Sequence, residues 1–291
     1  MRGRLKRIAR KTLLYRSGVE YADFGLNHIE GCSHGCRYPC YAMMMKKRCG
    51  IIKNYQEWIT PKIVGNALEL LDKEIPKYKK DIKYVYLCFS TDPFMYKWKG
   101  VGDLSLKIIK RLNQDSIKVV TISKGVYPRE LVRGNIYGKN NEYGSTVVSL
   151  SGKFQKKVEP FAAPTERRIK SLKFLHDNGL KTWISMEPYP TPNIIKQNLT
   201  EILEKVSFVD KIVFGRWNYN AITSYSKDYK TFYNDCAYEV IRFCSKRGIE
   251  CHIKDGTADS DYLKQSAIYT PSYERILLSW CTALKRRVVS T

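Results

Sequence analysis

The chain has 291 residues, with 51 Lys and Arg against 28 Asp and Glu, which gives a formal net charge of +23 at pH 7. This length allows one large domain or two small ones, and no apolar run is long enough for a membrane-spanning helix. The nine cysteines are odd in number and mostly scattered, which favours reduced thiols and a soluble, cytoplasmic protein without disulfides.

The charge excess favours a polyanionic partner such as nucleic acid, because a strongly positive field attracts polyanions. The alternative is a solvated lysine-rich surface of the thermophile kind, although glutamate usually balances such lysines. Residues 1–16 alone hold seven Lys or Arg and no acidic residue. We interpret this segment either as an arm that binds phosphates or as a disordered tail.

A cysteine-rich loop follows a strand expected over 19–29. Cys32, Cys36 and Cys40 have the pattern Cys-x3-Cys-x3-Cys, and soft thiolates so closely spaced select zinc, copper(I) or iron–sulfur clusters. His34 and Cys49 are candidates for a fourth ligand, but neither gives the spacing of a zinc ribbon. Three thiolates suit a [4Fe–4S] cluster with one open iron, and the alternative is three incidental buried cysteines.

Beyond this loop, strands and helices alternate about every thirty residues. The expected strands are 85–89, 119–122, 145–150, 181–186, 211–214 and 250–253. The expected helices are 60–71, 104–112, 128–132, 165–176, 194–206 and 228–247. This alternation predicts βαβ units in an α/β fold, a partial (β/α)6 TIM-like barrel rather than an open doubly wound sheet. The expected division is a basic arm over 1–17, the barrel over 18–258 and an extension over 259–291.

Polar residues follow the expected strands, and in parallel α/β folds the active site lies at the carboxyl ends of the strands. The candidates are Ser90, Thr91, Asp92, Ser123, Lys124, Ser149, Ser151, Glu187 and Asn218. Each one alone is also compatible with ordinary turn chemistry. Together, at successive strand ends, they favour an enzyme over a binding module.

The cysteine loop resembles that of radical S-adenosylmethionine (radical SAM) enzymes. Its flanks, Asn27, Gly31, His34-Gly35 and Tyr41-Ala42, resemble the branch related to spore photoproduct lyase. The second spacer holds three residues rather than the usual two, because Pro39 is inserted after Tyr38. Since proline fixes φ and lacks an amide donor, the loop is expected to bulge to return Cys40 to the cluster.

The resemblance implies roles for residues along the barrel. Ser90, Thr91 and Asp92 match the segment that binds the amino group of S-adenosylmethionine, and Lys124 matches a lysine that pairs with its carboxylate. The further cofactor contacts that we expect are Tyr38, Ser149, Arg168 and Glu187. Cys88 lies near the position of a catalytic hydrogen donor, and its alternative role is a small buried hydrophobe. Tyr41 is expected either to relay a radical or to stack on adenine.

These features together predict a radical SAM enzyme of lyase or transferase type. We expect it to cleave S-adenosylmethionine reductively and to act on a nucleic acid base, in DNA repair or RNA modification, as a monomer supplied by an electron donor such as ferredoxin or flavodoxin. One alternative is the same chemistry on a small molecule or protein side chain. The other is a non-catalytic, metal-stabilised nucleic-acid-binding module. Among the aromatic residues after 214, those before Asp228 are expected to contact the substrate.

Overall fold

A computed structural model describes residues 5–17, 22–38, 40–259 and 262. Its main sheet has eight strands in the order β11-β10-β9-β8-β7-β6-β3-β2. The seven parallel strands are β3 (Phe24–Leu26), β6 (Tyr84–Leu87), β7 (Lys118–Ser123), β8 (Glu142–Thr146), β9 (Lys181–Tyr189), β10 (Lys211–Arg216) and β11 (Glu250–Ile253). β2 (Leu14–Arg16) joins β3 in antiparallel fashion, so the sheet is an incomplete barrel with β2 and β11 at its edges.

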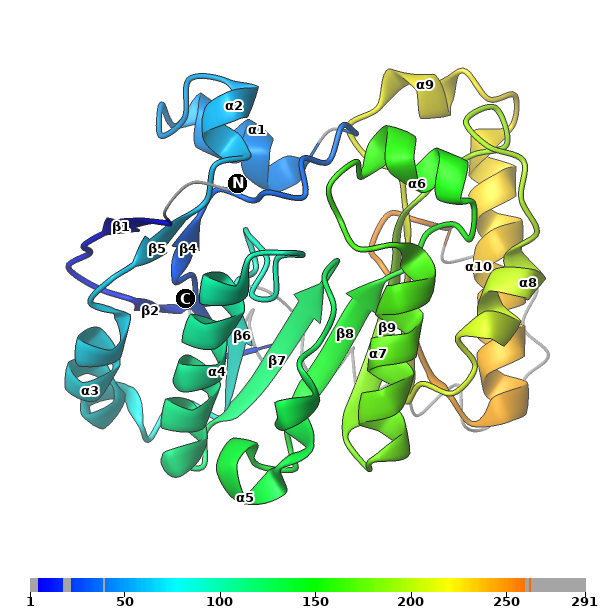
Figure 1. The fold of residues 1–291 in the computed structure, drawn as a ribbon. Helices are drawn as coiled ribbons and strands as arrows, with labels where there is room; N and C mark the ends of the chain where they lie inside the picture. Colours follow the sequence, from blue (N-terminus) through cyan, green and yellow to red (C-terminus); the bar gives the residue numbers. More distant parts are fainter. Residues whose placement is uncertain (1–4, 18–21, 39, 260–261, 263–291) are drawn as a thin grey trace, which may run out of the picture.

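The helices between these strands cover the outer face of the sheet (Figure 1). They are α3 (Ala67–Tyr78), α4 (Lys99–Gln114), η1 (Arg129–Val132), α5 (Gly134–Tyr137), α7 (Thr165–Asp177), α8 (Leu199–Lys205) and α10 (Tyr229–Arg247). α4 shows why they pack there: Val101, Ser105, Ile108, Ile109 and Leu112 recur at helical spacing and are all buried. Most predicted helices and strands of the barrel are therefore confirmed.

Alternation along the strands divides the apolar residues between two sides of the sheet. Val85 and Leu87 of β6 belong to the large core under the outer helices. Tyr86, between them, packs with Val120, Trp183 and Val213 in a smaller cluster of residues from β6, β7, β9 and β10. This smaller cluster therefore lies on the inner side of the barrel wall.

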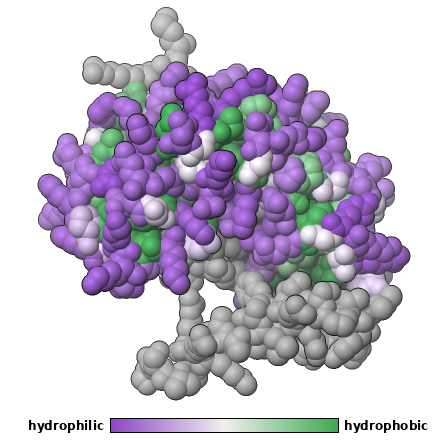
Figure 2. All heavy atoms as spheres, turned by 90° about the horizontal axis from the view of Figure 1, so that it is seen from below, coloured by the Kyte–Doolittle hydropathy of each residue, from purple (hydrophilic) through white to green (hydrophobic). Residues whose placement is uncertain are grey.

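Four short helices lie above the strand tips, at the top of Figure 1. They are α1 (Tyr41–Arg48), α2 (Tyr55–Trp58), α6 (Gly152–Val158) and α9 (Ala221–Ser224). The opposite face, seen from below, is mostly hydrophilic where the structure describes it (Figure 2). No helix among the described residues is long and apolar enough to cross a membrane.

A small second sheet of β1 (Lys6–Ile8), β5 (Lys62–Val64) and β4 (Ile29–Glu30) supports the cysteine loop, which begins directly after β4. This sheet corrects the prediction of a helix over 60–71. Residues 62–64 pair with β1 and β4, and α3 begins only at Ala67. The apolar Ile63 and Val64 fit a buried strand as well as a helix, so periodicity alone did not separate the two.

The basic segment at the N-terminus contributes to both sheets through β1 and β2. Leu13 and Leu14 are buried, and their backbone N–H groups donate to the carboxylate of Glu74 at 3.0 and 2.7 Å. The predicted division into arm, barrel and extension stays a prediction, and most of the extension lies outside the described residues.

Candidate functional site

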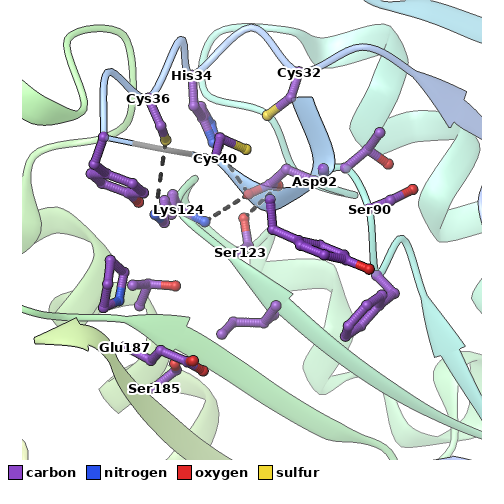
Figure 3. A pocket seen from close by; sticks show the side chains of 18 of the residues that line it. Cys32, His34, Cys36, Cys40, Ser90, Asp92, Ser123, Lys124, Ser185 and Glu187 are labelled. Atoms are coloured by element: carbon purple, nitrogen blue, oxygen red, sulfur yellow. Dashed lines mark hydrogen bonds and ion pairs between the residues drawn. The ribbon is translucent and has the colours of Figure 1, made fainter. Parts of the chain in front are cut away.

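A cavity of about 430 Å³ opens at the carboxyl ends of the parallel strands, beneath the cysteine loop (Figure 3). Its inner lining includes the apolar Tyr86, Ile122, Trp183 and Val213. Most of the predicted site residues line it, namely Cys32, Cys36, Cys40, Tyr38, Tyr41, Ser90, Thr91, Asp92, Lys124 and Glu187. The structure therefore brings these predicted residues together at one cavity.

The cysteine loop is held in a tight path by its glycines and by its neighbours. Gly31 and Gly35 have φ of +81° and +59°, and a Cβ on Gly35 would lie 2.6 Å from the Tyr55 hydroxyl and 2.8 Å from the Phe161 ring. Tyr55 also donates a hydrogen bond to the Gly35 carbonyl at 2.7 Å. This path presents the three thiols to one cavity.

The Cys36 thiol is buried, and those of Cys32 and Cys40 are partly buried. Burial raises the pKa of Cys32, Cys36 and Cys40, that of Cys40 to about 11. The Lys124 ammonium, 3.8 Å from Cys36 Sγ, is a nearby positive charge that opposes this shift for Cys36. Among the described residues, no three His, Cys, Asp or Glu side chains converge closely enough to hold one metal ion. Pro39, with its predicted bulge, lies outside the described residues.

His34 is held by hydrogen bonds to neighbouring groups. Its Nε2 accepts from the Tyr96 backbone N–H at 3.0 Å, so that Nδ1 carries the proton and faces Asp92 Oδ2 at 3.3 Å. Both ring nitrogens are therefore engaged within the protein, and His34 positions the loop. It does not present a nitrogen lone pair as a fourth metal ligand.

Asp92 connects the ends of β6 and β7 to the cysteine loop. Besides His34, it accepts hydrogen bonds from the Ser123 hydroxyl at 2.8 Å and from the Lys124 backbone N–H at 2.7 Å. Although burial opposes its ionisation, His34 and these hydrogen bonds keep the pKa of Asp92 below its ordinary value. Asp92 is thus a buried carboxylate whose hydrogen bonds hold the cysteine loop against the ends of β6 and β7.

Lys124 also takes part in a buried charge network. Its Nζ lies 2.8 Å from Glu159 Oε1, and Arg168 binds the other oxygen of Glu159 at 2.6 Å. Tyr38 donates to Glu159 at 3.0 Å, and its ring centroid lies 4.6 Å from Lys124 Nζ. Burial alone would raise the pKa of Glu159, but Arg168 and Lys124 outweigh it and lower that pKa to about 2.

Four of the predicted site residues do not line the cavity, namely Cys88, Arg168, Ser149 and Ser151, and Ser151 instead caps the N-terminus of α6. Cys88 is buried, and its Sγ lies 3.3 Å from His28 Nδ1. Arg168 is buried behind Glu159, where it also donates to the carbonyls of Ala163 and Thr146. Ser149 lines a separate hollow beside α6.

Ser149 lies outside the cavity lining because β8 ends earlier than the sequence predicts. The strand ends at Thr146, four residues before the predicted end at 150, and Thr146 lines the cavity instead. Ser185 on β9 lines it too and was missed, because it lies inside the predicted strand rather than at its end. The alternation of side chains along a strand could have indicated Ser185 and Glu187 together.

No family model matches the sequence. The chain is 28% identical over 170 residues to an uncharacterized protein of Methanocaldococcus jannaschii, covering 57% of this chain and 60% of that protein. It is 24% identical over 199 residues to an uncharacterized protein of Acidianus two-tailed virus, covering 65% of this chain and 64% of that protein. The chain thus spans less than two thirds of the length of these curated relatives.

Solved structures of spore photoproduct lyase share its architecture. Spore photoproduct lyase complexed with dinucleoside spore photoproduct matches with a TM-score of 0.61 and 13% identity, over 86% of this chain and 81% of the lyase. A double mutant of the lyase with bound AdoMet (S-adenosylmethionine) and the same dinucleoside matches with a TM-score of 0.60 and 12% identity, over 85% and 80%. The chain therefore has the partial-barrel fold of spore photoproduct lyase, which confirms the predicted fold and, at the level of the fold, the predicted resemblance.

Proposed function

We propose that this protein is a radical SAM enzyme that binds a [4Fe–4S] cluster through Cys32, Cys36 and Cys40 and acts on a base in nucleic acid. The observation that carries the proposal is that these three thiols, Lys124 and the Ser90–Asp92 segment all line one cavity, in the fold of spore photoproduct lyase. Repair of a DNA lesion and modification of an RNA base are both compatible with this chemistry.

The donor set fits the cluster. Three thiols that burial keeps from ionising suit a metal group that supplies the missing positive charge, and thiolates are the usual ligands of iron–sulfur clusters. When bound, the cluster would supply the electron that cleaves the sulfonium bond of S-adenosylmethionine to give methionine and a 5′-deoxyadenosyl radical. The cofactor carries that chemistry, while the protein provides binding, orientation and exclusion of competing reactants.

The chain's own residues would bind and orient the cofactor. The Lys124 ammonium, held by Glu159 beside Cys36, would pair with the cofactor's carboxylate. The Ser90–Asp92 segment would face its amino group, with Asn27 holding Ser90 through hydrogen bonds of 3.1 and 3.2 Å. Tyr38 would pack against the cofactor. The apolar inner lining would keep water from the reacting atoms.

The remaining predicted residues have weaker support. Glu187 lines the cavity and would contact the cofactor directly, whereas Arg168 would act through Glu159. Ser149 and Cys88 stay predictions, since their side chains lie outside the cavity lining. Tyr41 stays a candidate for radical relay or for stacking.

Nucleic acid is the substrate class that the charge supports best. The net charge of +23 attracts phosphates, and the structural neighbour is complexed with a dinucleoside photoproduct. We further propose a ferredoxin- or flavodoxin-like electron donor, a cytoplasmic location and a monomeric state. A small-molecule or protein substrate remains the second candidate, because a cavity of about 430 Å³ also falls in the range of small-molecule sites.

Anaerobic reconstitution with iron and sulfide tests the proposal. The wild-type protein should turn brown and release 5′-deoxyadenosine from S-adenosylmethionine under a chemical reductant. Each of Cys32→Ala, Cys36→Ala and Cys40→Ala should abolish that release, whereas Cys49→Ala, on an exposed cysteine at the end of α1, should not.

Two results would contradict the proposal. A colourless protein that contains zinc would indicate the non-catalytic, metal-stabilised module. Retention of the cluster in Cys40→Ala, with loss in Cys49→Ala, would show that the third ligand was wrongly assigned.

A further inference from the structure

Two tyrosines from distant parts of the chain stack on each other at the cavity. Tyr41 is the first residue of α1, directly after Cys40, and Tyr219 lies in the loop after β10. Their ring centroids are 6.1 Å apart with an interplanar angle of 28°, and both residues line the cavity. We call this pair the tyrosine platform.

The platform is exposed, so core packing does not account for it. Tyr41 is 51% exposed and Tyr219 is 64% exposed. Large aromatic rings normally bury most of their surface, and an exposed pair beside a cavity marks a surface that is available to a ligand.

The loop that carries Tyr219 is held on both sides. Trp217 is buried, packs edge-on against Tyr38 at 5.3 Å and donates its backbone N–H to the Tyr233 hydroxyl at 3.0 Å. After Tyr219, the Asn220 side chain accepts a hydrogen bond from the Ile222 N–H at 3.0 Å. The ring of Tyr219 is therefore presented in place before any ligand binds.

The backbone of Tyr219 adds a second sign of function. Its φ is +58°, in the left-handed region that residues other than glycine, asparagine and aspartate seldom adopt. Strained conformations of this kind persist where the surroundings impose them, and they cluster at ligand sites. Here the strained residue is the one that completes the platform.

Positive charge lies close to the platform. α1 starts with Tyr41 and ends with Lys46, Lys47 and Arg48, and it contains no acidic residue. At 1.5 Å per residue, these cations lie about 7.5–10.5 Å along the helix axis from Tyr41. Arg216 and Lys254 line the same cavity. A ligand that offers both flat rings and regularly spaced negative charges matches this surface.

We infer that the tyrosine platform stacks a base of single-stranded nucleic acid, next to the nucleotide whose base enters the cavity, while the basic end of α1 holds the adjoining phosphates. The inference rests on the proposed function, which makes nucleic acid the substrate. Aromatic side chains bind bases of any sequence by stacking, so the platform would position the strand without reading its sequence.

The test measures binding of a single-stranded oligonucleotide that carries 2-aminopurine, whose fluorescence falls when it stacks on an aromatic ring. Reconstituted protein is compared with Tyr219→Asn, which removes the ring yet tolerates the left-handed backbone, and with Tyr219→Phe, which keeps the ring. Tyr225→Ala is the matched control. The sequence predicted the aromatic residues before Asp228 as substrate contacts, but Tyr225 lies just after α9, is 78% exposed and does not line the cavity.

Tyr219→Asn should weaken binding by about 5- to 100-fold and abolish the quenching, while Tyr219→Phe and Tyr225→Ala stay close to wild type. Neutralising Lys46, Lys47 and Arg48 to Gln should reduce the slope of log affinity against log salt by about two units. Binding of heparin, a polyanion without bases, should respond to the charge variants and not to Tyr219→Asn.

Equal affinities of Tyr219→Asn and wild type for the oligonucleotide would overturn the inference. So would a loss confined to S-adenosylmethionine affinity, since the ring would then hold the cofactor's adenine. Release of 5′-deoxyadenosine is measured on the same samples and reports on the proposed cofactor cleavage, independently of the platform. A failure of the platform is therefore distinguishable from a failure of the proposed radical chemistry.

Discussion

Glu159 is the residue on which the buried charges of the site depend. It is 2% exposed and lies between the ammonium of Lys124 and the guanidinium of Arg168. Glu159→Gln would leave the buried Arg168 and the partly buried Lys124 with one neutral partner, and removing one member of a buried pair typically destabilises by about 3–5 kcal/mol. Urea denaturation should show this loss, whereas Glu166→Gln, on an exposed position of α7, should change stability by less than about 0.5 kcal/mol.

The lowered pKa of Glu159 predicts that the free energy of unfolding depends on pH. Its pKa in the folded protein is about 2, below its ordinary value of 4.5, because the two cations outweigh the effect of burial. The stabilisation is therefore complete above about pH 4.5 and is lost as the pH falls toward 2. Between these pH values, wild-type stability should fall more steeply than that of Glu159→Gln. Parallel curves for the two proteins would contradict this.

The prediction for cofactor binding concerns Lys124. Its ammonium is paired with Glu159 and lines the cavity beside Cys36. Lys124→Ala should weaken S-adenosylmethionine binding by about 1.5–3 kcal/mol, as expected for a lost charge-assisted hydrogen bond, and should keep the brown colour of the cluster. Calorimetry measures the affinity, and Lys153→Ala on the exposed side of α6 is the control.

Single residues of the site differ in how far the sequence could predict them. Asp92 and Lys124 were found because strand ends of a parallel sheet meet at one edge, which depends only on the order of elements. The partnership of Lys124 with Glu159 and the stacking of Tyr41 on Tyr219 depend on side chains from different elements, and no local pattern encodes them.

At the scale of the elements, Gly35 in the cysteine loop can be compared with Gly50, which follows α1. Gly35 and Gly50 both have positive φ, but a Cβ on Gly35 would meet Tyr55 and Phe161 below 3.0 Å, whereas one on Gly50 would meet nothing within 4 Å. Gly50→Ala should cost only about 1–2 kcal/mol for the left-handed backbone. Gly35→Ala should cost more and should also lower the iron bound per chain after reconstitution, because the loop must shift. Equal iron content and stability in the two variants would contradict this.

The elements themselves were predictable where their pattern was long. α4, α7 and α10 carry several turns of apolar spacing. The bounds of α7 and α10 were predicted to within one residue, whereas the predicted 104–112 covers only the inner part of α4. Short apolar runs failed: β5 was interpreted as the start of a helix, and the end of β8 was placed four residues too late. In both places the pairing of strands decides the structure, and pairing is a contact between segments distant in sequence.

At the scale of the whole molecule, the N-terminal segment combines a high positive charge with strands that belong to both sheets. If 1–17 were only a basic arm, its removal would weaken nucleic-acid binding and leave stability unchanged. In the structure, however, β1 and β2 extend both sheets, and Leu13 and Leu14 are buried in the main core. Deleting 1–17 should therefore destabilise the protein, since each buried leucine alone contributes about 1.5–3 kcal/mol.

The charge and the packing of this segment can be separated. Replacing the exposed Lys6 and Lys11 with Gln removes two charges but keeps the strands, so the melting temperature should stay near that of wild type while oligonucleotide binding weakens slightly at low salt. The deletion should lower both the melting temperature and the affinity. A deletion variant that melts with the wild type would show that the segment behaves as a detached arm, and that β2 adds no stability to the edge of the barrel.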